Sequence, residues 1–478
     1  MRRLIHFFPA RVVVPISALM LILTCCSLAG QPAPGAPQKL RVSENHRYFE
    51  REDGAPFFYL GDTAWELFHR LTREEADRYL ADRARKGFTV IQAVALSEID
   101  GIEAPNAYGE LALIDKDPTR PNEAYFKHID YIVDKAQELG LFIGMLPTWG
   151  SYWKQEGGKT IFNEANAAIY GRFIGRRYRD KAVIWILGGD QNPGNDQERR
   201  IIEAMAAGLK EGDGGNHLIT YHPRGPGLSS NFFHQSGWLD FNMYQSSHSA
   251  REHDNGLFAE HDRKLDPAKP TLDGEARYEC IPVGFYFANA NRFDRFTDAD
   301  VRLAAYWSLL AGACGHTYGN NNIWQMWTES RAPIIFANIP WFEALDHPGA
   351  LQMGFVRRLF ESRPFQKLEP CQDMILDGPR AGAARIRAAR AIDGSFAFIY
   401  SPRGERFSID QSSIKGDRIK EIWYDPRYGV AYQSHTGTSK AIQTYTPPSS
   451  GPGCDWILIL EDPAENFPLP GPAGGPRP

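Results

Sequence analysis

The chain has 478 residues, of which 43% are hydrophobic and 23% charged, the balance of an ordinary globular protein. A formal net charge of −5 excludes a broad electrostatic preference for nucleic acid or for anionic membranes, so we predict no nucleic-acid partner. At this length two or three domains are expected, because one domain takes about 100–200 residues and barrels run longer.

The first 29 residues have the layout of a signal peptide. A basic stretch precedes the apolar run of residues 12–23, and small residues follow up to Ala29, where cleavage is expected. That run is too short to span a bilayer, and no other stretch predicts a transmembrane segment. We therefore predict a secreted or periplasmic protein. The alternative is an outer-membrane lipoprotein anchored at Cys25, although Thr24 stands where Gly, Ala or Ser is usual.

Export permits disulfide bonds. A chain cut after residue 29 keeps four cysteines: Cys280, Cys314, Cys371 and Cys454. One prediction pairs Cys371 with Cys454 and Cys280 with Cys314; the other is four buried free thiols. The sequence alone does not decide between them.

Residues 31–37 read as a linker, and from 38 to 364 short apolar segments alternate with helical ones, which predicts βα units around a parallel sheet. The expected strands cover residues 57–61, 89–95, 141–147, 183–187, 218–222, 240–244, 271–275 and 315–318. The expected helices cover residues 73–86, 125–139, 163–178, 197–210, 298–311 and 349–362. No glycine-rich nucleotide fingerprint follows the first strand, so a (β/α)₈ TIM barrel is favoured over an open doubly wound sheet.

After residue 364 the pattern changes to short alternating segments separated by turns, such as 382–388, 395–400, 419–424 and 456–460. This pattern predicts a small antiparallel β-sandwich over residues 365–463. Residues 464–478, rich in Pro and Gly, are expected to be a disordered tail. Deletion from residue 364 onward would leave activity intact if the sandwich is accessory, and would abolish folding if it is structural.

In a (β/α)₈ barrel the active site lies at the C-terminal ends of the strands. Those ends here combine acids, amides and aromatic rings, a mixture that suits a carbohydrate, whose hydroxyl groups need polar partners and whose ring faces are apolar. The residues predicted to bind the sugar are Asp62, Trp65, Trp149, His222, Tyr244, Gln245, Tyr278 and Trp324. For Asp62 the alternative is a cap on the following helical turn.

Glycosidic hydrolysis needs two carboxyl groups with different duties. Asp190 follows the fourth expected strand and a pair of glycines, and its apolar neighbours would keep it protonated as the general acid. Glu275 ends the seventh strand, where Arg277, two residues on, would keep it ionised as the nucleophile. Asp273 and Glu279 are competing nucleophiles, but Glu275 lies further toward the rim than Asp273.

The segments GDTAWELFHRLT, VIWILGGDQN, DGEARYE and VRLAAYWSLLAGACGHTYGNNNIWQMW together resemble the apiosidase-like barrel family of secreted bacterial glycosidases, which includes glycoside hydrolase family 140. This resemblance covers about residues 40–364. It implies a retaining mechanism, with the acid/base on the GGD motif at Asp190 and the nucleophile on the GE motif at Glu275. It also implies attack on apiose-containing pectin side chains, although members with other substrates are common. The region that follows resembles the collagen-binding-type domain that accompanies this barrel, from which we predict no collagen binding.

Two other enzyme classes fit the sequence less well. Histidines gather between residues 222 and 261, but none has a metal-ligand spacing such as His-Glu-x-x-His, so we expect no metal and no cofactor. They are His222, the expected substrate contact, and His234, His248, His253 and His261, read as core or surface residues. No G-x-S-x-G elbow indicates a serine hydrolase.

The predicted function is a secreted retaining glycoside hydrolase acting on plant cell-wall pectic polysaccharide or oligosaccharide, with apiosidase as its finer form. The alternative is a non-catalytic carbohydrate-binding protein on a degenerate barrel. Such a protein would keep the aromatic rim but would not need both Asp190 and Glu275, so their joint presence favours an enzyme.

Overall fold

The computed structural model describes residues 39–438 and 441–471. The predicted signal peptide with Cys25, the linker at 31–37 and the last seven residues lie outside this described part. Among the described residues, no helix is both long enough and apolar enough to cross a membrane.

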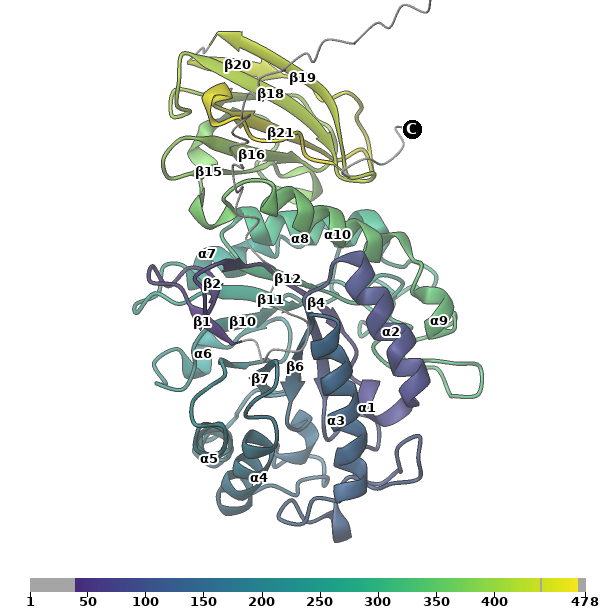
Figure 1. Ribbon diagram of the computed structural model, residues 1–478. Helices are drawn as coiled ribbons and strands as arrows, with labels where there is room; N and C mark the ends of the chain where they lie inside the picture. Colours follow the sequence, from purple (N-terminus) through teal and green to yellow (C-terminus); the bar gives the residue numbers. More distant parts are fainter. Residues whose placement is uncertain (1–38, 439–440, 472–478) are drawn as a thin grey trace, which may run out of the picture. The chain divides into compact units, whose positions relative to one another are not determined.

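A curled sheet of nine strands forms the centre of the N-terminal domain (Figure 1). Its order is β8 (Ile219–Tyr221), β7 (Val183–Leu187), β6 (Phe142–Leu146), β5 (Val90–Val94), β4 (Tyr59–Thr63), β12 (Gly315–Tyr318), β11 (Thr271–Glu275), β10 (Asn242–Gln245) and β9 (Gly227–Leu228). All neighbours are parallel except β9, which runs antiparallel to β10. Each of the eight predicted strands is present, within two residues at either end.

The sheet has the curvature of a TIM-like fold, but the described strands at its two ends are not joined by the regular hydrogen-bond ladder that joins the other strands. No ladder joins β8 to β10 in the described residues. Instead the amide of Asp240 donates to the carbonyl of Ile219 at 2.9 Å, and the Thr220 hydroxyl donates to the carbonyl of Phe241 at 2.7 Å. Complete closure of the barrel therefore stays a prediction.

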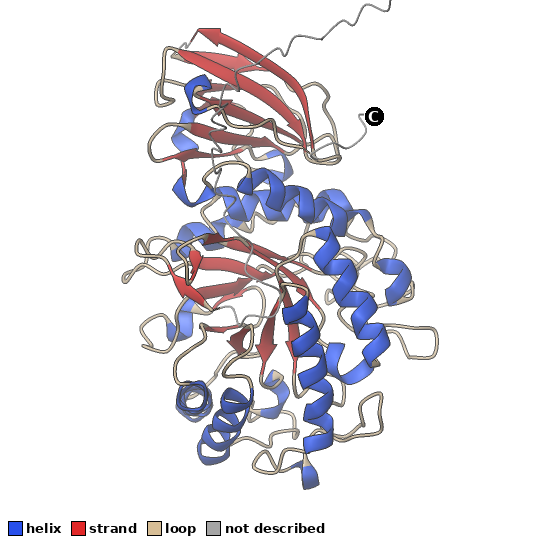
Figure 2. Ribbon diagram, viewed as in Figure 1, coloured by secondary structure: helices blue, strands red, loops and turns tan. Residues whose placement is uncertain are grey.

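Helices cover the outside of this sheet (Figure 2). The long ones are α2 (Arg73–Lys86), α3 (Glu123–Glu138), α4 (Glu164–Arg177), α5 (Asp196–Asp213), α8 (Asp298–Leu310) and α10 (Pro348–Glu361). The short ones are α1 (Leu67–Arg70), α6 (Ser230–Phe233), α7 (Gly256–Asp262) and α9 (Trp341–Ala344). Local signals set their ends: Thr72 and Glu75 form a capping box at the start of α2, and Gly87 closes it with φ +94°. The small antiparallel sheet before them was not predicted; it comprises β1 (Leu40–Val42), β2 (Phe49–Arg51) and β3 (Pro56–Phe57).

The C-terminal domain consists of two antiparallel sheets, as predicted for a sandwich. The larger has the order β13 (Leu368–Pro370), β15 (Arg387–Ala391), β16 (Phe396–Ser401), β21 (Trp456–Glu461), β18 (Arg418–Asp425) and β19 (Val430–Thr438). The smaller contains β14 (Ile375–Asp377), β17 (Phe407–Asp410) and β20 (Ile442–Tyr445). The strand predicted at 382–388 begins only at Arg387. Phe467, which the sequence places in the tail, packs edge-on against Phe396 at 5.7 Å, so the start of that tail belongs to this domain.

The two domains share a hydrophobic core. Tyr306 of α8 stacks on Tyr400 of β16 with ring centroids 4.8 Å apart, and Phe360 of α10 contacts Phe398 at 5.5 Å. A buried ion pair joins Arg302 of α8 to Asp455, N to O 2.7 Å. Helices α8 and α10 therefore have apolar partners in the N-terminal domain and in the C-terminal domain.

In the described chain the four cysteines are free thiols, so the predicted disulfide pairs are wrong. The alternative of four buried thiols holds in part, because Cys314 is buried and the other three are half-buried. Topology explains why Cys280 and Cys314 do not pair. Strands β11 and β12 run parallel, with Asp273 opposite His316. Cys314 precedes β12 at one end of the sheet, whereas Cys280 follows β11 beyond the other end.

Candidate active site

A cavity of about 380 Å³ opens at the C-terminal ends of the parallel strands. The predicted pair, Asp190 and Glu275, both line it. Asp190 follows β7, and Glu275 is the last residue of β11. The sheet therefore brings to one cavity two carboxyl groups that are 85 positions apart in the sequence (275 − 190).

A left-handed turn after β7 places Asp190. Gly188, Gly189 and Asp190 have φ values of +98°, +78° and +55°, which only glycine adopts without strain. The first two sites also lack room: a Cβ on Gly188 would lie 2.2 Å from the carbonyl oxygen of His222, and one on Gly189 would lie 2.7 Å from the amide nitrogen of Gly150. The Gly-Gly pair is thus required to turn the chain into the cavity, and Asp190 continues the same left-handed turn.

The environment of Asp190 favours its protonated form. Burial raises the pKa of its carboxyl group to about 6, and the negative charge of Glu275 acts in the same direction. Positive charge on His222 and Arg224 and the amide of Gln245 oppose this rise. A carboxyl group with this pKa still holds its proton in mildly acidic solution, as a general acid must.

Two histidines hold Glu275 ionised. Nε2 of His248 donates to Oε1 of Glu275 at 3.1 Å, and Nε2 of His222 lies 3.2 Å from Oε2. Burial alone would raise the pKa of this carboxyl group, but contacts with His222 and His248 lower it to about 2. The two acids therefore differ in protonation across several pH units, the condition for one to donate a proton while the other attacks.

The structure corrects the predicted partner of Glu275. Arg277 does not approach it: its guanidinium donates to the backbone carbonyls of Ala250 and His253, and it lies over the ring of Trp307 at 5.7 Å. His248, read from sequence as a core or surface residue, takes that place. A side chain two residues along the strand points to the same side only while the strand continues, and β11 ends at Glu275.

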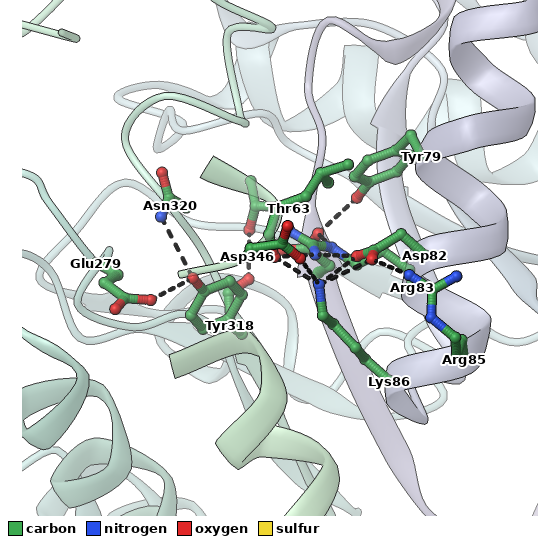
Figure 3. A network of polar contacts seen from close by, with 12 residues as sticks. Thr63, Tyr79, Asp82, Arg83, Arg85, Lys86, Glu279, Tyr318, Asn320 and Asp346 are labelled. Carbon is green, nitrogen blue, oxygen red and sulfur yellow. Dashed lines mark hydrogen bonds and ion pairs between the residues drawn. The ribbon is translucent and has the colours of Figure 1, made fainter. Parts of the chain in front are cut away.

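The competing acids do not line the cavity. Asp273 is fully buried and accepts hydrogen bonds from Ser246 Oγ at 2.7 Å and Asn255 Nδ2 at 2.9 Å. Glu279 accepts from the Tyr318 hydroxyl at 2.6 Å (Figure 3). Of the three acids on this stretch of chain, Glu275 alone faces the cavity that contains Asp190.

The predicted sugar-binding residues divide into two groups. Those that line the cavity are Trp65, Trp149, Gln245, Tyr278 and Trp324. His222, predicted as a substrate contact, is fully buried and does not line the cavity; its Nε2 lies 3.2 Å from Oε2 of Glu275. The other two predicted residues, Asp62 and Tyr244, point away from the cavity.

The alternation of side chains along a strand explains why Asp62 does not face the cavity as predicted. Along β4 successive side chains face opposite sides, and Asp62 faces α2. There it accepts from Arg83 Nε at 2.5 Å and from the Tyr79 hydroxyl at 2.6 Å. Arg83 and Lys86 also bind Asp82 (Figure 3). Asp62 is therefore part of a buried ion-pair network, not a cap and not a sugar ligand. Tyr244 likewise stacks on Phe258, with the planes 10° apart.

Sequence reasoning missed several cavity residues. They are Glu98, Arg224, Ser247, His248, Phe285 and Tyr286. All lie on loops beyond the strand ends, where no periodic pattern tells which side chains turn inward. Glu98 follows β5 by four positions (98 − 94), so the rule that placed Glu275 could have suggested it. Within residues 39–438 and 441–471, no three His, Cys, Asp or Glu side chains are grouped as a metal site would require.

A family model described as "Apiosidase-like, catalytic domain" matches residues 43–367. The chain belongs to the apiosidase-like family. A second model, "Putative collagen-binding domain of a collagenase", matches residues 370–461. The predicted resemblance is thereby confirmed for both regions.

Solved structures place this apiosidase-like chain among glycoside hydrolases. One described as "Glycoside hydrolase" is 33% identical, with a TM-score of 0.82 and coverage of 91% of this chain and 99% of the other. A glycoside hydrolase family 5 structure from Bacteroides vulgatus ATCC 8482 is 32% identical, with a TM-score of 0.83 and coverage of 91% and 96%. Another Bacteroides vulgatus structure, 15% identical with a TM-score of 0.67 and coverage of 90% and 83%, shares the fold. A comparison with curated proteins gives no match.

Proposed function

We propose that the protein is a retaining glycoside hydrolase that uses Asp190 as acid/base and Glu275 as nucleophile. The observation that carries the proposal is the pair itself: two carboxyl groups in one cavity, with the pKa of Asp190 raised to about 6 and that of Glu275 lowered to about 2. Membership of the apiosidase-like family and the likeness to glycoside hydrolases support it.

In the first step Glu275 attacks the anomeric carbon and Asp190 gives its proton to the departing oxygen, so the glycosidic bond breaks as a glycosyl–enzyme ester forms. In the second step ionised Asp190 takes a proton from water, and the resulting nucleophile displaces Glu275 from the anomeric carbon. The contacts of His222 and His248 keep Glu275 ionised and in place before each cycle. The Trp65 and Trp149 rings, with centroids 5.6 Å apart, form an apolar wall against which a sugar face can pack.

The finer proposal is a pectic substrate, with apiose as the first sugar to test. It rests on the apiosidase-like match. Arg224, an exposed cation on the cavity lining, is compatible with the acidic sugars of pectin. Export through the signal peptide is part of this proposal, and N-terminal sequencing of protein recovered from the medium and from the periplasm would test it.

A panel of pectic oligosaccharides and aryl glycosides tests the function, with Glu275→Gln as the control and products read by mass spectrometry. Release of a sugar by the wild type only would establish the hydrolase and name the substrate. Proton NMR of the first product formed would show the same anomer as the substrate for a retaining enzyme. The opposite anomer would refute retention. No release, together with saccharide binding, would favour the alternative of a binding protein on this barrel.

A further inference from the structure

A third carboxyl group, that of Glu98, lines the same cavity as Asp190 and Glu275. One buried acid, Glu66, holds the residues on either side of Glu98 in the chain. The Ser97 hydroxyl donates to Oε2 of Glu66 at 3.1 Å, and the amide of Ile99 donates to Oε1 at 3.0 Å. The Tyr152 hydroxyl also donates to the carbonyl of Ser97 at 3.0 Å. Glu98 is thus presented to the cavity by a fixed loop, as a preorganised binding group should be.

The Glu98 carboxyl group has no hydrogen-bond or ion-pair partner among the residues that the structure describes. The charged groups that act on it most strongly are Asp190, Glu66 and Glu275, all acids, and one cation, Arg70. Arg70 is engaged elsewhere: its Nε lies 3.7 Å from Glu66, and its Nη1 donates to the carbonyl of Gln325 at 2.6 Å. A preorganised carboxyl group among three others, with no cation of its own, is suited to a ligand group that can both accept and donate a hydrogen bond.

We propose that Glu98 is a substrate-binding residue that stays neutral and hydrogen-bonds a hydroxyl group of the sugar, as a donor through its own O–H and an acceptor through its carbonyl oxygen. This inference rests on the proposed function, whose two catalytic carboxyl groups share the cavity. It assigns to the site a third carboxyl group whose duty is recognition and not proton transfer.

The electrostatics agree with the geometry. Burial raises the pKa of Glu98 well above its ordinary value, and the charges of Asp190, Glu66 and Glu275 add to this rise. Asp190 differs, because His222 and Arg224 oppose the rise in its pKa. Asp190 therefore ionises more readily of the two and cycles as acid/base, while Glu98 keeps its proton. A negative Glu98 would also raise the cost of ionising Asp190 as it gives up its proton in the first step.

Two substitutions separate a neutral donor from a charged or catalytic group. Glu98→Gln keeps the size, the carbonyl acceptor and an N–H donor, so we expect kcat/KM within about threefold of the wild type. Glu98→Ala removes the hydrogen bonds, and we expect a loss of about 10- to 100-fold in kcat/KM, chiefly through KM. Glu138→Gln changes an exposed acid on α3; it is the control and should leave both constants unchanged.

Three kinetic results would overturn the inference. Equal losses in Glu98→Gln and Glu98→Ala would mean that a negative charge is needed. A Glu98→Gln enzyme that fails on poor leaving groups and still cleaves activated aryl glycosides would make Glu98 the acid. Wild-type kinetics in Glu98→Ala would mean that it does not touch substrate.

A measurement that needs no substrate keeps this inference separate from the proposed function. A raised pKa in the folded state gives stability that is present at low pH and lost as pH rises through the folded pKa. We therefore expect the Tm of Glu98→Gln to exceed that of the wild type increasingly as pH rises from 5 to 9, whereas Glu138→Gln should not. The infrared carbonyl band of a protonated acid, present in the wild type at neutral pH and weakened in Glu98→Gln, would agree.

If the wild type cleaves nothing on the panel while the Tm and infrared differences appear, the proposed function fails and the neutral state of Glu98 stands. Tm differences that do not change with pH and no lost infrared band would overturn the inference whatever the activity.

Discussion

Arg302 and Asp455 join the two domains through a buried ion pair, and breaking it tests whether the C-terminal domain is structural. Their side chains are 1% and 3% exposed, with N to O distances of 2.7 and 3.0 Å. Removing one member of such a pair costs about 3–5 kcal/mol, because it leaves the other charge buried and unpaired. At roughly 2–4 °C per kcal/mol in a large domain, Arg302→Ala should lower Tm by about 6–20 °C.

Calorimetry and thermal-shift assays measure this change, with a matched control on the surface. Arg172 pairs with Glu211 at 2.6 Å, but their side chains are 38% and 59% exposed, so Arg172→Ala should leave Tm unchanged. The double variant Arg302→Met with Asp455→Leu should recover much of the loss, since apolar residues of similar volume can replace a buried pair. If Arg302→Ala shifted Tm no more than Arg172→Ala, the domain would be accessory, and a chain ending near residue 364 should fold and keep its activity.

Three further predictions concern the proposed catalytic pair, Asp190 and Glu275. As pH rises through about 6, kcat/KM should fall because Asp190 loses the proton it must donate, and a pH profile that stays flat to pH 8 would exclude it as the acid. His248→Ala removes a hydrogen bond to a charged group, worth about 1.5–3 kcal/mol, so the pKa of Glu275 should rise by about one to two units. Its activity should then fall at pH 4 while changing little at pH 6; unchanged activity ratios would refute the role of His248. Gly189→Ala places a Cβ 2.7 Å from the amide nitrogen of Gly150 at φ +78°, so kcat should drop about 100-fold with circular dichroism preserved. Normal turnover would show that the turn tolerates the change.

Much of the fold follows from the sequence because buried parallel strands are continuous apolar runs. Val183–Leu187 is predicted to the residue for this reason, and Arg73–Lys86 because its capping residues are local. The small sheet containing Leu40–Val42 was missed, since its strands have only two or three residues each and carry no period. The disulfide prediction failed because distance in the sequence says nothing about which end of a sheet a cysteine occupies.

The site was predictable only where a strand directly presents a side chain. Glu275 is the last residue of a strand and faces the cavity, whereas Glu98 and His248 lie on loops whose course depends on contacts far along the chain, such as those of Glu66 with Ser97 and Ile99. Asp62 failed for a different reason. It lies near a strand end as expected, but alternation turns it outward, where Arg83 neutralises it.

A strand-end acid is therefore weak evidence of catalysis in this fold, and the partners of the acid indicate its role. Asp62, Asp273 and Glu279 are all buried, and each accepts hydrogen bonds from protein donors. Asp190 and Glu98 face the cavity with few or none, so their hydrogen-bonding capacity is left for a ligand. Glu275 lies between these cases, because two histidines contact it yet it still faces the cavity. A nucleophile needs hydrogen-bonding partners that keep its carboxylate ionised and still leave it open to the cavity. The two histidines give Glu275 such partners, and this distinguishes it from Asp273 and Glu279 better than its position along the strand does.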